Sequence, residues 1–385
     1  MKKIGILVNS MNFGGNERSA ANIAKSLKNR FDVCIITQEQ NNSIESNVSI
    51  FNLDTPCKKG FFGKVQNSFI RFIRLRKLIK KEKIDTVLVI LAVSNVLNYL
   101  PLGCERIVSC RDCGDLMKNA GKYLWMTMLS KKIVFNSKYQ ENYFYKKYRV
   151  KKNKRTTIYN ILDTDSIMDK IKEPVEKEFI SFIEGKECII SMGRFVDVKG
   201  FSNLLKSFYL AQLKKPTLRL ILIGDGVLKN KICDLIQKLE LTDKVMLLGY
   251  RKNPFKYIAK CSIFALPSYS EGFPNVLLEA LACSVPVVAT DCPSGPREIL
   301  DANYKNELEH VNSNICYETG VLCPIFERSN EWNPTVFYDS NSQFAEALLT
   351  VLDNNSEMNY KENTRKRALE FSEGHIVNEW IKIFQ

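Results

Sequence analysis

The fold is decided by the stretch Ser270-Glu271-Gly272-Phe273-Pro274-Asn275-Val276-Leu277-Leu278-Glu279. Before it, the apolar run 262–266 reads as a buried strand, and after it a helical pattern starts at Asn275. The next strand-like run, 286–289, follows directly. Strand, turn, helix and strand in this order predict a parallel sheet, and such sheets bind ligands beyond the carboxyl ends of their strands. Glu271 and Glu279 therefore mark a candidate site.

The same alternation extends along the whole chain and predicts an α/β fold with two doubly wound sheets. Strand-like runs alternate with helical patterns from residue 3, and the pattern restarts at Cys188. A length of 385 residues suits two domains better than one. We expect a Rossmann-like domain at 1–165, a second at 166–360 that begins with a charged linker at 165–186, and a helix at 361–385 that packs back toward the first domain.

The composition excludes several classes of protein. An apolar content of 45% is ample for packed cores, so a wholly disordered chain is excluded. The 12 cysteines are scattered, which favours reduced thiols in a cytosolic protein over a disulfide scaffold. The start of the chain shows no signal-peptide pattern. Polar residues and Pro101 interrupt the longest apolar run, which falls short of the roughly 20 residues that a membrane-spanning helix needs.

The positive charge is concentrated in the first part of the chain. The net charge is +14, and residues 1–165 carry 30 Lys and Arg against 13 Asp and Glu. The helical pattern at 68–83 sets apolar and basic faces apart, as in helices that lie on anionic lipid. A core-packing helix with a solvated charged face is the alternative. We expect an anionic membrane surface as a partner and no nucleic acid, because no recognised nucleic-acid module is present.

Small and cationic residues follow several predicted strands. Gly14 and Gly15 precede a helix, where they let the backbone approach a phosphate. This loop lacks the G-x-G-x-x-G pattern of nicotinamide-cofactor sites. Arg194 and Lys199 follow the strand at 188–192, and such a pair suits a diphosphate, although a solvated loop is the alternative. Gly224 and Tyr250 follow two further strands.

We expect neither a metal nor another cofactor. Asp163-Thr164-Asp165 has the D-x-D form that can hold a divalent cation, but an N-cap and first turn of a helix explain it better. Arg194 and Lys199 already supply positive charge for a diphosphate. Cys110-Arg111-Asp112-Cys113 has no second cysteine pair at a spacing typical of zinc sites.

Taken together, these motifs resemble glycosyltransferase family 4. They occur in the family's order over nearly the whole chain, and the strongest is Glu271-Gly272-Phe273-Pro274 followed by Glu279. Asp291 to Ile299 and Gly320-Val321-Leu322 are also similar to segments of bacterial members, many of which build surface polysaccharides or glycan precursors on lipid carriers. The resemblance implies a GT-B fold, in which two Rossmann-like domains face each other across a cleft.

The resemblance further implies a retaining, metal-independent hexosyltransferase. It would move a sugar from a UDP-sugar donor to a lipid-linked or oligosaccharide acceptor, on the inner face of the cell membrane. Arg194 and Lys199 would neutralise the departing diphosphate, and Glu271 would contact the donor sugar. The implied substrate-binding residues are Gly14, Gly15, Arg111, Gly224, Tyr250, Gly272, Phe273, Pro274, Asn275 and Glu279. Among these, Glu279 would bind the ribose hydroxyls and the main chain near Tyr250 would meet the base.

Two other interpretations compete with this one. A glycosidase would use Glu271 and Glu279 as acid and nucleophile, but its mechanism needs no phosphate-type loops. A non-catalytic sugar-nucleotide or polyanion binder with a GT-B shape is the alternative function. Family members often carry a His in the first domain, where this chain has Ser109-Cys110-Arg111-Asp112. We expect Arg111 to contact the donor phosphate or the acceptor instead.

Overall fold

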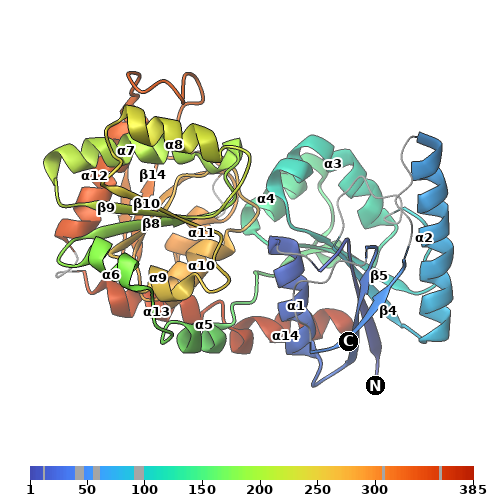
Figure 1. The fold of residues 1–385 in the computed structure, drawn as a ribbon. Helices are drawn as coiled ribbons and strands as arrows, with labels where there is room; N and C mark the ends of the chain where they lie inside the picture. The colour runs from blue at the N-terminus through green and yellow to red at the C-terminus, as the bar shows by residue number, and fades with distance from the viewer. Residues whose placement is uncertain (12–13, 40–46, 55–60, 91–98, 306–307, 355–357) are drawn as a thin grey trace. The chain divides into compact units, whose positions relative to one another are not determined.

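A computed structural model describes the chain except residues 12–13, 40–46, 55–60, 91–98, 306–307 and 355–357 (Figure 1). It divides into two compact units. The first unit combines Met1–Ile161 with Ser372–Gln385, and the second is Leu162–Phe371. In the described residues, each unit is built around one seven-stranded sheet.

The sheet of the first unit is parallel throughout and has the order β3-β2-β1-β4-β5-β6-β7. Its strands are β1 (Lys3–Val8), β2 (Asp32–Thr37), β3 (Ser49–Asn52), β4 (Thr86–Ile90), β5 (Glu105–Cys110), β6 (Lys132–Phe135) and β7 (Arg155–Thr157). Its helices are α1 (Gly15–Leu27), α2 (Phe61–Lys81), α3 (Cys113–Met128), α4 (Lys138–Tyr148), the short 3-10 helix η2 (Lys152–Lys154) and α14 (Glu373–Phe384).

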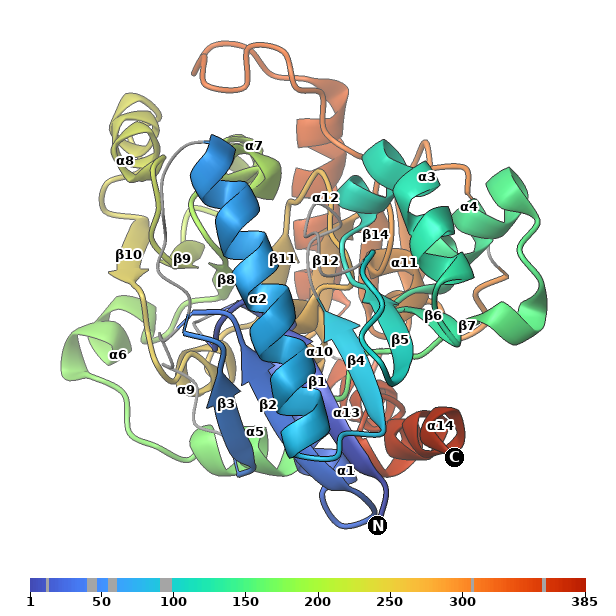
Figure 2. The same ribbon diagram turned by 90° about the vertical axis from the view of Figure 1, so that its right-hand side faces the viewer.

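The helices of the first unit cover both faces of its sheet (Figure 2). Leu88 packs with residues of α1 and α14, whereas its neighbour Val89 packs with Leu75 of α2 on the opposite face. The register places Val108 of β5 opposite Val89, and Val108 packs with Leu116 of α3 and with α4. Because residues paired across a sheet point to the same side, α2, α3 and α4 share one face of the sheet, and α1 and α14 share the other.

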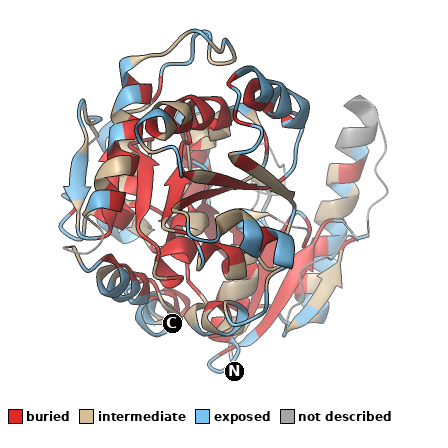
Figure 3. Cartoon of the chain, turned by 60° about the vertical axis from the view of Figure 1, so that its left-hand side comes forward, coloured by how far each residue is buried: buried red, intermediate tan, exposed pale blue. Residues whose placement is uncertain are grey.

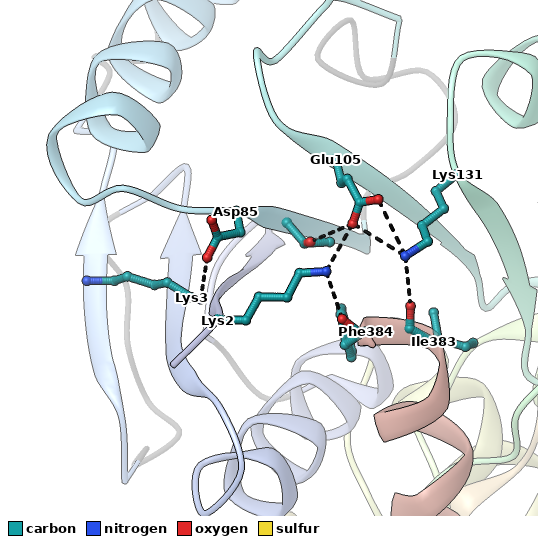
Figure 4. A network of polar contacts seen from close by, with 8 residues as sticks. Lys2, Lys3, Asp85, Glu105, Lys131, Ile383 and Phe384 are labelled. Atoms are coloured by element: carbon teal, nitrogen blue, oxygen red, sulfur yellow. Dashed lines mark hydrogen bonds and ion pairs between the residues drawn. The ribbon is translucent and has the colours of Figure 1, made fainter.

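The C-terminal helix α14 is anchored in the first unit by apolar and polar contacts. Trp380 and Phe384 are fully buried, and the Phe384 ring packs edge-on against Phe31 at 5.9 Å between centroids. Lys2 Nζ donates to the carbonyl of Phe384 at 2.7 Å, and Lys131 Nζ donates to that of Ile383 (Figure 4). Cations at the last carbonyls of a helix complement its dipole.

The sheet of the second unit has the order β10-β9-β8-β11-β12-β14-β13, and only β13 runs antiparallel in the described residues. Its strands are β8 (Cys188–Met192), β9 (Arg219–Ile223), β10 (Val245–Gly249), β11 (Ile263–Leu266), β12 (Val287–Thr290), β13 (Ile315–Tyr317) and β14 (Gly320–Cys323). Its helices are α5 (Thr164–Lys170), α6 (Lys177–Ile183), the 3-10 helix η3 (Asp197–Lys199), α7 (Phe201–Lys214), α8 (Lys229–Lys238), α9 (Phe255–Ile258), α10 (Asn275–Ala282), α11 (Pro296–Leu300), α12 (Asp339–Asp353) and α13 (Tyr360–Leu369).

The bounds of the units differ from the expected 165 and 360. Residues 162–165 belong to the second unit, and so does α13, because it packs on α10. The expected linker at 165–186 is wrong, because this segment folds into α5 and α6. Phe179 of α6 is buried against the ring of Tyr257 at 5.0 Å. The N-cap interpretation of Asp163 is confirmed, since its carboxylate accepts from the Ser166 amide.

The buried residues lie mainly in the strands and the inner helix faces (Figure 3). In the second unit, α7, α8 and α12 share one core cluster with β8, β9 and β11. Among the described residues, no helix is both long and apolar enough to cross a bilayer.

Candidate active site

The predicted site residues of the second unit follow the carboxyl ends of four adjacent parallel strands. Arg194 and Lys199 follow β8, Gly224 follows β9, Tyr250 follows β10, and Glu271 follows β11. The order β10-β9-β8-β11 makes these strands direct neighbours. Their loops therefore lie at one edge of the sheet, where open α/β sheets bind ligands.

Lys199 and Glu271 form an ion pair across two of these loops. Lys199 Nζ lies 2.6 Å from Glu271 Oε1, and Ser268 Oγ donates to the same oxygen at 2.6 Å. The two charged side chains retain only 19% and 11% of their exposure. In the described residues, Oε2 of Glu271 has no hydrogen-bond partner. An ionised carboxylate accepts at both oxygens, so Oε2 remains available to a ligand hydroxyl.

The backbone fixes the spacing of these two loops. The Tyr269 amide donates to the carbonyl of Val198 at 2.9 Å. Gly200 has a φ of +63°, and a Cβ there would lie 2.1 Å from the carbonyl oxygen of Pro267. Only glycine fits this approach, so the chain places Lys199 beside Glu271 by way of a glycine contact.

Arg194 differs from Lys199 in being exposed. In the part of the chain that the structure describes, its guanidinium has neither a hydrogen bond nor an ion pair. The backbone around it is nevertheless held, because the Phe195 amide donates to Asp225 O at 2.9 Å. A guanidinium on a fixed loop is well placed to bind an anion in two parallel bonds.

Gly224 allows the β8 and β9 loops to touch. Its φ is +148°, and a Cβ there would lie 1.9 Å from Gly193 O. Its amide donates to Gly249 O at 3.0 Å, which connects the β9 loop with the end of β10. Tyr250, the next residue after β10, is half exposed. The predicted residues of three strands thus meet through backbone contacts.

The loop that follows β12 contacts the segment after Glu271 and holds it in place. Ser294 Oγ donates to the carbonyl of Gly272. Gly295 has a φ of +104°, and a Cβ there would lie 2.3 Å from Pro274 Cδ. The Phe273 ring is buried 5.8 Å from that of Phe371. These contacts fix the backbone that leads into α10.

Asn275 begins α10, and Glu279 lies further along this helix. Glu279 is 7% exposed. Its carboxylate thus sits at the margin of the core, one helical turn beyond the Glu271 loop. The structure places the two glutamates on one strand–turn–helix unit, as the sequence predicts.

A second ion cluster, centred on the buried Asp291, supports the β12 loop, and sequence reasoning did not identify it. Arg297 donates from Nε to Asp291 Oδ1 at 3.0 Å and from Nη2 to Glu309 O at 2.7 Å. His310 Nδ1 lies 3.4 Å from Asp291 Oδ2, and this hydrogen bond raises the pKa of His310. No sequence pattern links His310 to Asp291, because helix α11 and the residues after it separate the two along the chain.

In the first unit, Gly14 and Gly15 form the start of α1. Gly14 is extended, with a φ of −153°, and no atom of the described residues lies within 4 Å of a Cβ built on Gly15. Residues 12–13 of the expected glycine loop lie outside the described residues. The proximity of these glycines to a diphosphate stays a prediction.

Arg111 follows β5 and is almost fully buried. Its Nε donates to Ser109 Oγ at 3.0 Å, and Nη1 donates to Ser19 Oγ and to Asn160. The guanidinium also stands 5.8 Å from the ring centre of Trp380. Burial lowers the pKa of Arg111 to about 10, so it keeps its charge at neutral pH. These contacts lie within the first unit, and the expected contact with donor or acceptor stays a prediction.

The described residues contain no group of three potential metal ligands. The predicted charged side chains at this edge of the sheet are those of Arg194, Lys199 and Glu271. Two cations and a carboxylate can bind a sugar diphosphate at both of its ends. Independence of metals stays a prediction.

Two family models match the chain. The model of the glycosyl transferases group 1 matches residues 173–367, and that of glycosyltransferase family 4 matches residues 13–166. The first of these ranges lies within the second unit, and the other covers most of the first unit and ends a few residues into the second.

Curated relatives match either the whole chain or part of it. An uncharacterised glycosyltransferase of Methanocaldococcus jannaschii is 33% identical over 60% of this chain, and the match spans only 57% of that relative. The N-acetylgalactosamine-N,N'-diacetylbacillosaminyl-diphospho-undecaprenol 4-alpha-N-acetylgalactosaminyltransferase of Campylobacter jejuni is 30% identical over 99% of both chains.

Solved structures confirm the GT-B fold. A glycosyltransferase from Rickettsia africae superposes with a TM-score of 0.74 at 16% identity, over 100% of this chain and 97% of that one. Anabaena HepE, solved in complex with UDP, superposes with a TM-score of 0.73 at 15% identity, over 100% and 99%. At these identities the likeness concerns the fold.

Proposed function

We propose that this chain, which belongs to glycosyltransferase family 4, is a retaining hexosyltransferase. It would move a sugar from a UDP-sugar to an acceptor that is linked to a lipid diphosphate. The observation that carries the proposal is the Lys199–Glu271 pair beside Arg194 at the edge of the second sheet. Glycosyl transfer from a nucleotide sugar needs a positive charge at the diphosphate and acceptors at the sugar.

The cations would act on the leaving group. As the bond between the anomeric carbon and the diphosphate oxygen breaks, negative charge grows on the β-phosphate. Fixed cations at that position stabilise the transition state more than the ground state. Arg194 would bind the phosphate oxygens through two N–H groups, and Lys199 would supply a point charge held in place by Glu271.

Glu271 would orient the sugar. Its Oε1 is occupied by Lys199 and Ser268, and its Oε2 would accept from a sugar hydroxyl. Glu279 would accept from the ribose hydroxyls further along α10. In this assignment neither glutamate is a nucleophile, since both hold the donor for a departure assisted by the cations.

The relatives support the choice of donor and acceptor. The name of the Campylobacter relative describes α-transfer of N-acetylgalactosamine to a glycan on diphospho-undecaprenol, and the Anabaena structure contains UDP. Since UDP-hexoses are mostly α-linked, an α-linked product would correspond to retention. An acceptor of this kind lies in a membrane, so the enzyme would work at the inner membrane surface.

A direct assay tests the proposal. The purified chain is incubated with UDP- and GDP-hexoses and a short-chain lipid diphosphate that carries one sugar. We expect UDP release with one UDP-hexose and a product whose anomeric proton coupling shows retention. Lys215→Ala, which removes the cation of the Lys215–Glu187 pair at the opposite end of the sheet, serves as the control. Failure to turn over any donor while UDP still binds would favour a non-catalytic binder.

A further inference from the structure

The outward side of α3 exposes large apolar residues together with lysines. Trp125 is 55% exposed, Met128 60% and Leu129 47%, although such residues are usually buried. We define the α3 outer face by six exposed residues: Met117, Lys118, Lys122, Trp125, Met128 and Leu129. It lies in the helix labelled α3 in Figure 1 and at its C-terminal end.

The exposed residues are separate from those that hold α3 on the sheet. Leu116, Tyr123 and Met126 point inward and belong to the core under α3. Lys122, Trp125 and Leu129 recur at spacings of three and four, which places them on one side of the helix. Among the residues that the structure describes, the packing of α3 on its sheet therefore does not involve the α3 outer face.

The α3 outer face is positively charged. Residues 116–140 contain five lysines and no acidic residue. The acid within α3 is Asp115, whose carboxylate accepts from Tyr123 Oη and from Asn119 Nδ2, both at 2.9 Å. It is thus engaged in the first turns of the helix and does not neutralise Lys118 or Lys122.

The neighbouring helix extends this surface. A Cβ on Gly121 would lie 3.6 Å from Tyr148 Oη, so the end of α4 adjoins the middle of α3. Lys147 Nζ stands 5.8 Å from the ring centres of Tyr143 and Tyr148, and Lys146 and Lys147 are exposed. The end of α4 therefore combines aromatic rings with lysine ammonium groups, as the α3 outer face does.

We propose that the α3 outer face docks the first unit on an anionic lipid bilayer, with Trp125, Met128 and Leu129 inserted at headgroup depth and Lys118 and Lys122 bound to lipid phosphates. Tryptophan favours this depth, and exposed lysines are attracted to anionic leaflets. The inference rests on the proposed function in that a lipid-linked acceptor lies in the membrane. It shifts the candidate docking element to α3 from α2, for which the sequence leaves lipid contact and core packing open.

The composition of the face distinguishes lipid from other partners. A symmetric dimer would press the same face against its copy, and its lysines would then repel each other without an acid to pair with. Nucleic acid would use the lysines but would leave Met128 and Leu129 in water. An anionic bilayer accommodates both the cations and the apolar side chains.

Trp125 provides a built-in reporter, because it is the exposed one of the three tryptophans, whereas Trp332 is half-buried and Trp380 is buried. The full chain is titrated with vesicles of equal parts phosphatidylglycerol and phosphatidylcholine. We expect a blue shift of the emission that Trp125→Phe abolishes. Trp125→Ser combined with Met128→Ser should weaken co-sedimentation about tenfold, and high salt should weaken it further. Leu213→Ser, at an equally exposed site on α7, is the matched control.

Several outcomes would overturn the docking surface. One is unchanged vesicle binding in the double variant, and another is an equal loss in Leu213→Ser. The third is a dimer in solution that dissociates in Trp125→Ser. Phe69→Ser on α2 compares the two helices: loss of binding in this variant alone would assign docking to α2 and overturn the proposal.

Activity assays separate the docking surface from the proposed function. If docking holds, the double variant should keep wild-type turnover on a short-chain acceptor and lose it on an acceptor embedded in vesicles. An inactive wild type that still binds vesicles through α3 would contradict the proposed function alone. An active wild type that ignores vesicles would contradict the docking surface alone.

Discussion

Lys199 Nζ and Glu271 Oε1 lie 2.6 Å apart, on loops that follow two neighbouring strands of the second sheet. The family resemblance implies that they bind opposite ends of a ligand, the diphosphate and the sugar. In the structure they bind each other directly. Each side chain thereby orients the other, and the loss of either should disturb both contacts with a donor.

Replacing one member of this pair should therefore cost both stability and rate. Lys199→Ala leaves a mostly buried carboxylate with Ser268 as its remaining partner, which we expect to destabilise the chain by about 1–3 kcal/mol. Turnover should fall roughly 10²–10³-fold, as when a fixed transition-state group is removed. Lys199→Met with Glu271→Gln should regain stability in urea unfolding without regaining turnover. Recovery of both would contradict the catalytic assignment.

Arg194 should behave differently, because it is exposed and makes no side-chain contact in the described residues. We expect Arg194→Ala to change the free energy of unfolding by less than about 0.5 kcal/mol. UDP affinity and turnover should both fall, and Arg194→Lys should restore only part of each, since an ammonium lacks the two-pronged geometry. Calorimetric titration with UDP measures the binding. Unaltered binding and turnover in Arg194→Ala would remove it from the site.

Much of the site could be predicted from the sequence, because parallel strands place their ends at one edge. Arg194, Gly224 and Glu271 were predicted to follow strand ends at one edge, and the structure places them there, while their roles stay predictions. The ion pair was not, since Lys199 and Glu271 are 72 positions apart and pair only because β11 lies next to β8. Adjacency of this kind depends on chain connectivity, which local patterns do not contain.

The fold shows the same division between local and non-local information. The N-cap at Asp163 depends on residues within one turn and was predicted correctly. The expected linker at 165–186 was wrong. The segment is rich in charged residues, but its Phe179 packs against Tyr257, which is distant in the sequence and cannot be identified as a partner from the segment itself. The expectation that the residues of α13 pack toward the first domain was wrong for a similar reason. The sequence of α13 alone does not indicate that the helix packs against α10.

Alanine substitutions at two glycines of the predicted site should differ in their effect on stability. Gly224→Ala places a Cβ 1.9 Å from Gly193 O at a φ of +148°, so we expect a loss of about 1–3 kcal/mol or more and a loss of turnover. Gly15→Ala meets no atom within 4 Å and should leave stability unchanged. If Gly15 faces a diphosphate, UDP-sugar affinity should still fall. Thermal unfolding and UDP titration of both variants distinguish the two effects.

Arg111 should prove essential for the stability of the first unit. Arg111→Ala removes the donors to Ser109, Ser19 and Asn160, and we expect a loss of about 1–3 kcal/mol. Arg111→Lys keeps the charge but cannot reach all three partners, so it should rescue little. Hydrogen exchange of α14 should rise in both variants, because the contact with Trp380 is lost. Reduced turnover without any change in exchange would favour the expected contact with substrate.

The pair His310–Asp291 should make stability depend on pH. The hydrogen bond to Asp291 raises the pKa of His310 in the folded chain above its unfolded value of about 6.5. The stabilisation is therefore fully present below pH 6.5 and is lost as the pH rises through the folded pKa. Relative to wild type, His310→Asn should be destabilised at pH 5.5 and should approach wild type at pH 8.5, as measured by urea midpoints. His375→Asn removes the other histidine and serves as the control. A difference between His310→Asn and wild type that stays constant across this range would show that packing, not protonation, makes His310 stabilising.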